Sequence, residues 1–219
     1  MPTTPWQAPP IDWTVPDGPT DWLVGTGATR LERVAVWACA AAGTAAVTGV
    51  ALHSGVSWRW WQWLLVLLVA VDLFGGAPAN ALSTAKRLYH SAPPPGAHPL
   101  DRLVRHPLGF SVLHLHPVVL AALLPEATWE WGFAWYLGCL GGTAVVVAAP
   151  AYVRRAVAFA VVALLLVLAP LLAPPDGLQW FGPLLAVKLV LAHAVREEPY
   201  RPGPWATTVQ TPQPNSSGT

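Results

Sequence analysis

Four polar side chains interrupt the apolar stretches of this sequence. Asp72 stands in "LLVAVDLFGG", Lys188 in "LLAVKLVLAH", and His114 and His116 in "LGFSVLHLHP". A carboxylate and an ammonium group can form an ion pair or orient a substrate, and an imidazole exchanges protons near neutral pH. These residue types indicate acid–base or electrostatic chemistry, provided that the fold brings them together.

The composition indicates whether water or lipid surrounds the chain. The 219-residue chain is 54% hydrophobic and only 11% charged, whereas a soluble domain has about 25% charged residues. This composition predicts a polytopic membrane protein, with the lipid bilayer and a small-molecule substrate as its partners. The net charge of +1 and the lack of a basic block argue against nucleic-acid binding.

Six runs of about 18–20 mainly apolar residues predict an all-α bundle of six transmembrane helices. The expected spans are 34–52, 60–82, 107–124, 131–150, 153–173 and 178–195. The third run is the least regular, because the two histidines interrupt it. We therefore expect a transmembrane domain over residues 30–198, and the oligomeric state stays open.

Basic residues predict the orientation of these spans. One side of the six-span arrangement holds Arg30, Arg33, Lys86, Arg87, Arg102, Arg105, Arg154, Arg155, Arg196 and Arg201. The other side holds only Arg59, and such asymmetry places the basic side in the cytoplasm. The Pro/Trp-rich segment 1–29 and a disordered tail, 199–219, are both expected on the cytoplasmic side of the cell membrane.

The polar residues are expected at similar depths. With a rise of about 1.5 Å per residue, Asp72 lies near the middle of the bilayer, and Lys188, His114 and His116 lie roughly 10 Å below the cytoplasmic surface. A lone charge at the centre of a span costs about 2.5–3.5 kcal/mol, so Asp72 and Lys188 should pair or face water. The alternative is an ion pair that only fixes helix packing.

The sequence "DLFGGAPAN", residues 72–80, favours a pocket beside Asp72. Gly75 and Gly76 permit close approach of a ligand or a helix, and Pro78 predicts a kink. We expect a group of substrate-binding residues at the cytoplasmic mouth of this pocket, although its basic members can instead anchor the chain to anionic lipid. The group comprises Asn80, Lys86, Arg87, His90, His193 and Arg196.

His114 and His116 are two residues apart, so their side chains would point about 200° from each other in a regular helix. We therefore expect separate roles for them, and they could share a ligand only if the backbone left the helix near Pro117. No histidine box of the di-iron type and no HExxH motif is present. We expect no metal, and the alternative is a mononuclear site formed by one of these histidines with His193 and Asp72.

The patterns "DLFGGAPAN", "KRLYH", "LGFSVLHLHP" and "VREEPYRP" resemble bacterial multi-pass membrane proteins to which no activity is attached. The resemblance covers most of residues 60–201 and implies no reaction, so the cofactor stays unknown. The Ala/Pro/Val-rich composition also resembles membrane enzymes of bacterial natural-product pathways, including enzymes that form diazo groups from nitrite.

The leading hypothesis is a membrane-embedded enzyme with a pocket open to the cytoplasm, acting on a small anionic or lipophilic biosynthetic intermediate. Asp72 is expected to act as a base or orienting carboxylate, and His114 or His116 as the general acid or base. Lys188 would anchor an anionic group or act as an amine nucleophile. A transporter or proton-coupled channel, a nitrite-using diazo-forming enzyme and a scaffold subunit are the alternatives.

Overall fold

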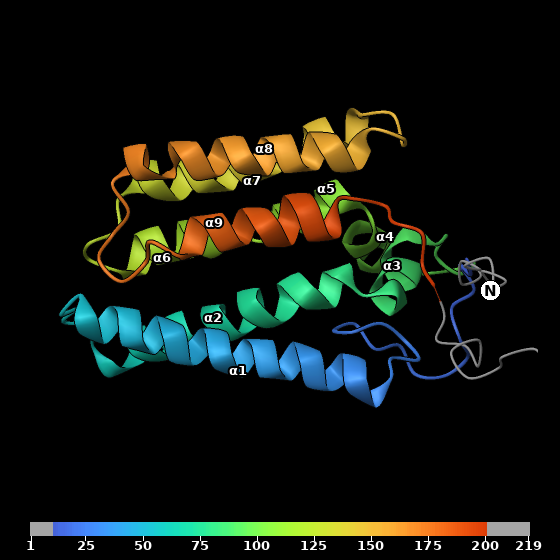
Figure 1. Cartoon of the computed structure of the whole chain (residues 1–219), viewed down its shortest axis with the longest axis horizontal. Helices are drawn as coiled ribbons and strands as arrows, with labels where there is room; N and C mark the ends of the chain where they lie inside the picture. Colours follow the sequence, from blue (N-terminus) through green and yellow to red (C-terminus); the bar gives the residue numbers. More distant parts are fainter. Residues whose placement is uncertain (1–10, 201–219) are drawn as a thin grey trace, which may run out of the picture.

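The computed structural model describes residues 11–200, which form helices and one isolated β-bridge. The helices run back and forth along the long axis of the molecule (Figure 1). Their bounds are α1 (Arg30–His53), α2 (Trp60–Ala81), α3 (Ser83–His90), α4 (Pro99–Arg105), α5 (Pro107–Leu113), α6 (His116–Leu123), α7 (Trp129–Ala148), α8 (Arg154–Leu168), the 3-10 turn η1 (Ala169–Leu172), α9 (Phe181–Ala186) and the π-helical segment η2 (Val187–His193). The fold is therefore all-helical over the described residues, as the sequence predicts.

The centre of the bundle is the continuous helix formed by α9 and η2. The hairpin of α1 and α2 lies on one side of it, and the hairpin of α7 and α8 lies on the other (Figure 1). Segment η2 contacts α2, α5, α7 and α8. Leu185, Leu189 and Val190 are at most 1% exposed, so this helix supplies much of the hydrophobic core.

Four helices are long and apolar enough to cross a membrane: α1, α2, α7 and the combined segment Arg154–Leu172. A fifth candidate joins α4 to the segment Pro107–Leu123, but these two parts are bent by 100°. The sixth expected span contains the apolar helix Phe181–His193, which is shorter than the roughly 20 residues that a straight crossing needs. The prediction of a membrane protein is thus supported, with four or five candidate spans.

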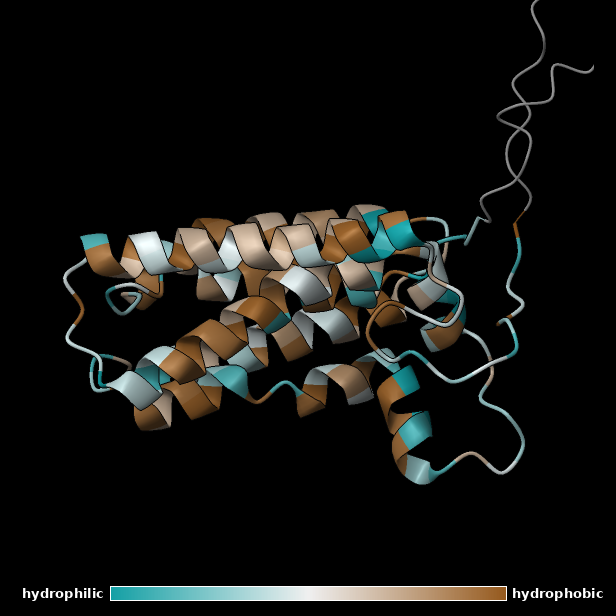
Figure 2. Cartoon of the chain, turned by 90° about the horizontal axis from the view of Figure 1, so that it is seen from below, coloured by the Kyte–Doolittle hydropathy of each residue, from teal (hydrophilic) through white to brown (hydrophobic). Residues whose placement is uncertain are grey.

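Hydrophobic residues make up most of the length of the long helices (Figure 2), and many of them are exposed. In α8 only Ala158 and Val162 are buried, while Leu164 and Val167 are 58% and 74% exposed. Side chains of this kind on one outward face require an apolar environment or a partner. The face therefore agrees with insertion in lipid.

Helix α1 begins at a capping box, in which Thr29 and Glu32 each accept a hydrogen bond from the backbone N–H of the other. Upstream of it, the N-terminal segment packs against the bundle, because Thr84 donates to the carbonyl of Val24 over 2.5 Å. Ile11 pairs with Tyr200 in the antiparallel bridge, so the two ends of the described chain lie together. Of the tail expected to be disordered, 199–219, Pro199 and Tyr200 pair with the N-terminal segment, and 201–219 lie outside the described residues.

Candidate functional site

The candidate site centres on a break in the third apolar segment. Helix α5 ends at Leu113, and α6 begins at His116 with Pro117 in its first turn. His114 has ψ of 67°, far from the helical value, and therefore the backbone leaves the helix at this residue. Pro117 contributes to the break because it lacks the N–H that a continuous helix would use.

Hydrogen bonds from neighbouring groups hold this break in place. The carbonyl of Val112 accepts from the hydroxyl of Tyr136 in α7 over 3.1 Å, and Ser111 pairs with Thr143 of α7 at 3.0 Å. At the far end of α6, Gln62 of α2 donates to the carbonyl of Leu123 over 2.9 Å. Carbonyls freed from a helix inside a membrane must find such partners.

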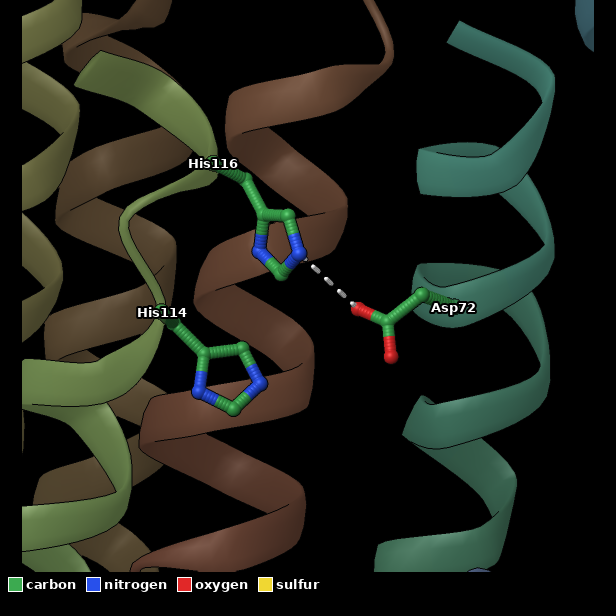
Figure 3. A group of neighbouring side chains, drawn as sticks. All are labelled: Asp72, His114 and His116. Carbon is green, nitrogen blue, oxygen red and sulfur yellow. Dashed lines mark ion pairs between the residues drawn. The ribbon is translucent and has the colours of Figure 1, made fainter. Parts of the chain in front are cut away.

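The break turns both imidazoles toward Asp72 of α2 (Figure 3). The centroids of the His114 and His116 rings are 5.4 Å apart, and one ligand atom from each of the three residues lies within 4.8 Å of the others. The expectation that the two histidines point in different directions is wrong, because it assumed a regular helix through His114 and Leu115. The structure thus brings three of the predicted catalytic residues together.

Lys188 completes the group from the central helix. Its Nζ atom lies 2.6 Å from Oδ2 of Asp72 and 3.3 Å from the backbone carbonyl oxygen of the same residue. The lysine side chain is only 3% exposed. We infer from these two bonds that Lys188 positions the Asp72 carboxylate, which leaves its ammonium group less available as a nucleophile.

Gly76 provides the space for this lysine. A Cβ atom at Gly76 would lie 2.6 Å from Cε and 2.8 Å from Nζ of Lys188, closer than real contacts allow. Gly75, by contrast, faces Ala40 of α1, where an added Cβ would lie at 3.3 Å. Of the two predicted small residues, one therefore serves the ion pair and the other serves helix packing.

The π-helical geometry of η2 coincides with Lys188. Ala194 donates to the carbonyl of Leu189, five residues earlier, over 3.0 Å, and α-helical geometry returns only N-terminal to Val187. Such wide turns are rare in proteins, and those that do occur are frequently found at functional sites. A broken helix and a π-helical segment thus contribute the histidines and the lysine of one cluster.

The cluster is open on one side. The side chains of Asp72 and His116 are 41% and 30% exposed, while His114 is 9% exposed as a residue. Asp72 is near the middle of α2, so this opening lies along the length of the bundle and not at its end.

A cavity does lie at the end of the bundle that carries the basic loop, but other residues form it. Its volume is about 550 Å³, and Trp22, Tyr89, His98, Leu100, Asp101 and Val104 line it. None of the predicted site residues is among them. This cavity and the Asp72 cluster therefore share no residue.

Two of the predicted substrate-binding residues make hydrogen bonds that connect distant parts of the fold. Lys86 is 2% exposed and donates to the carbonyls of Ala192 and Val195, which end the central helix. Burial lowers the pKa of Lys86 to about 8. Arg87 donates to the carbonyl of Tyr200 over 3.2 Å, so these two basic residues hold the C-terminal segment of the described chain against the bundle.

The remaining predicted binding residues are distributed around the same end. His90 contacts the carbonyl of His193 at 3.0 Å, and burial, followed by the charge of Lys86, lowers the pKa of His90 to about 4. Arg196 lies over the ring of Trp13, 4.4 Å from its centroid. Asn80 is 5% exposed, and its Nδ2 has no hydrogen-bond partner within the described residues.

The sequence interpretation missed Phe110, which connects two histidines. Its ring is stacked on His193 at 3.7 Å between centroids, and its carbonyl contacts Nδ1 of His114 at 2.7 Å. The spacing of four residues between Phe110 and His114 is the signal that could have indicated this contact. Phe110 thereby fixes the ring orientation of His114.

No protein-family model, curated protein or solved structure matches this chain. This result agrees with a resemblance that implies no activity. The site itself must therefore carry any conclusion about function.

Proposed function

We propose that this protein is a membrane-embedded enzyme whose reaction centre is the cluster of Asp72, His114, His116 and Lys188. The observation that carries the proposal is the convergence of a carboxylate, an ammonium group and two imidazoles from three separate segments inside an apolar bundle. Ionisable groups within membrane segments are costly and commonly functional. The opening beside Asp72 suits a small lipophilic or anionic biosynthetic intermediate that enters from the side.

The hydrogen bonds suggest a role for each residue. Nδ1 of His114 contacts a carbonyl, which only accepts, so this atom carries the proton and Nε2 presents a lone pair. His114 would therefore act as the general base. Lys188 holds Asp72 in its charged form, and His116, with Nε2 at 3.7 Å from Asp72, would relay a proton or orient the substrate.

We extend the proposal to topology: six crossings with both termini in the cytoplasm. The basic residues support this orientation, and the pairing of Ile11 with Tyr200 supports an even number of crossings. Single cysteines at the exposed positions Ser57 and Ala92, in a background without Cys39 and Cys139, test it. A membrane-impermeant maleimide should label Ser57→Cys, and not Ala92→Cys, in intact cells; the reverse pattern would contradict the orientation.

The catalytic proposal is tested in cells that lack the gene and carry either the original chain or a variant. Asp72→Asn, His114→Ala and Lys188→Met should each cause one compound to accumulate, detected by untargeted mass spectrometry. His53→Gln, an exposed residue outside the cluster, is the control. Purified protein in lipid nanodiscs should then convert the accumulated compound. Full function of all three cluster variants would refute the proposal.

One observation favours a second candidate, a proton-coupled transporter. Two irregular segments, the α5–α6 break and η2, meet at the ionisable cluster, and discontinuous helices are typical of transporter sites. Reconstitution into liposomes that contain a pH-sensitive dye distinguishes the two classes. A transporter should move protons when the substrate is added to one side, whereas an enzyme should convert the substrate without a lasting flux.

A further inference from the structure

We infer that Asp72, His114 and His116 bind a divalent first-row transition-metal ion. The inference rests on the proposed function for the use of the site, and it reassigns Nε2 of His114 and of His116 from proton transfer to metal binding, because one lone pair cannot do both. Two imidazoles and one carboxylate offer donor atoms within 4.8 Å of one another. Catalytic zinc sites and non-haem iron sites use this set of three ligands and leave other coordination positions open.

The state of His116 points to a missing ligand. Its Nδ1 is buried without a hydrogen-bond partner in the described part of the chain. Its Nε2 is 3.7 Å from Oδ2 of Asp72, which is too long for a hydrogen bond. Because Nε2 is directed at the carboxylate without a hydrogen bond, its lone pair can bind a metal ion, and Nδ1 would keep the proton.

His114 is already prepared as a ligand. The contact between its Nδ1 and the carbonyl of Phe110 fixes the tautomer that leaves the Nε2 lone pair free. Metal-binding histidines usually make such a bond through their other nitrogen. Figure 3 shows that the imidazoles of His114 and His116 both project toward the Asp72 carboxylate.

Donor separations and local charge define how the ion would bind. Bonds of about 2.0–2.2 Å require donors closer together than 4.8 Å, so the two rings and the carboxylate must move inward slightly. Lys188 competes for Oδ2 of Asp72 and repels a cation, which lowers the affinity. Imidazole ligands select transition metals over Mg²⁺ and Ca²⁺, which prefer oxygen.

The test is metal titration of the full-length chain, purified in detergent and treated with a chelator. Co²⁺ should bind at one ion per chain with new visible absorption, Zn²⁺ should displace it, and Mg²⁺ should not. Asp72→Asn, His114→Gln and His116→Gln should each weaken binding more than tenfold, while His53→Gln binds normally. Lys188→Met should tighten binding, because it removes the competing ammonium group.

Absence of Co²⁺ absorption in the original chain, or equal weakening by His53→Gln and the cluster variants, would overturn the inference. A measurement without variants covers the case in which they misfold. Zn²⁺ should protect His116 from diethyl pyrocarbonate and leave the exposed His53 reactive; equal modification of both residues with and without Zn²⁺ would count against the site. Neither readout needs turnover, so the two proposals can fail separately. If the original chain binds no metal but the cluster variants still cause a compound to accumulate in cells, only the metal inference is rejected. If the original chain binds metal but the cluster variants cause no accumulation, only the enzyme proposal is rejected.

Discussion

Lys188 and Asp72 are 116 positions apart in the sequence, and their side chains form an ion pair of 2.6 Å in the middle of the bundle. The lysine is buried on the central helix, while the carboxylate is partly open on α2. Each residue therefore compensates the charge of the other in an apolar environment. The pair also joins the central helix to α2 at the candidate site.

Removal of one member of this pair should destabilise the protein more than removal of both. Lys188→Met leaves the Asp72 carboxylate without its cation, at a cost of about 2.5–3.5 kcal/mol. The double variant Asp72→Asn/Lys188→Met should recover part of that loss. Unfolding in mixed detergent micelles measures the four free energies of the cycle. Additive effects would show that the two groups do not stabilise each other.

Gly76→Ala should disturb the ion pair directly, because the new Cβ would lie 2.6 Å from Cε of Lys188. We expect a loss of about 1–3 kcal/mol, as for other cases of overpacking, together with loss of function. Gly141→Ala is the matched control, since a Cβ at that helical position meets no atom within 4 Å. The control should be neutral or stabilising by up to about 1 kcal/mol. Equal effects of the two substitutions would contradict the close approach.

His90 should make stability depend on pH in a defined window. Its pKa is about 4 in the folded chain, below the ordinary 6.5, so the unfolded chain binds more protons between these values. The contribution of His90 is therefore fully present above pH 6.5 and is lost as pH falls toward 4. Thermal unfolding in detergent should show Tm falling over this range.

His90→Gln separates this effect from that of other groups. The amide can still donate to the carbonyl of His193 but does not titrate, so the decrease of Tm between pH 6.5 and 4 should become smaller. An unchanged slope in this variant would show that other groups cause the pH dependence.

Lys86→Met should weaken the end of the central helix. The lysine donates to the carbonyls of Ala192 and Val195, and an apolar replacement leaves both buried carbonyls short of a donor. We expect a loss of about 1–3 kcal/mol, measured by the same unfolding assay. Arg102→Met, at an exposed position on α4, is the control and should change stability by less than about 0.5 kcal/mol. A smaller loss for Lys86→Met than for Arg102→Met would reject this role.

The sequence predicted the residues of the cluster because the cost of burying charge is a local property. Asp72 and Lys188 each stand out in an apolar run, and their depth can be counted from the ends of these runs. Their pairing was one of two expected outcomes, the other being contact with water, because neither charge is stable alone in that environment. The all-helical fold was predictable for the same reason, since apolar segments must satisfy their backbone groups internally.

The direction of the two histidines could not be predicted, because it depends on contacts between distant residues. Tyr136 and Thr143 of α7 stabilise the break in the preceding segment, and no local pattern identifies them as partners of Val112 and Ser111. Lys86 illustrates the same limit. A basic loop residue looks available for substrate, but its partners lie 106 and 109 positions away at the end of another helix.

The bridge between Ile11 and Tyr200, with Asp12 donating to the carbonyl of Pro199 over 2.9 Å, has a consequence for engineering. A short linker could join these adjacent ends, and the chain could be reopened in the exposed proline-rich turn near Gly96. Such a circular permutant would keep every helix and its neighbours while changing their order of synthesis. It would show whether the bundle depends on α1 entering the membrane first.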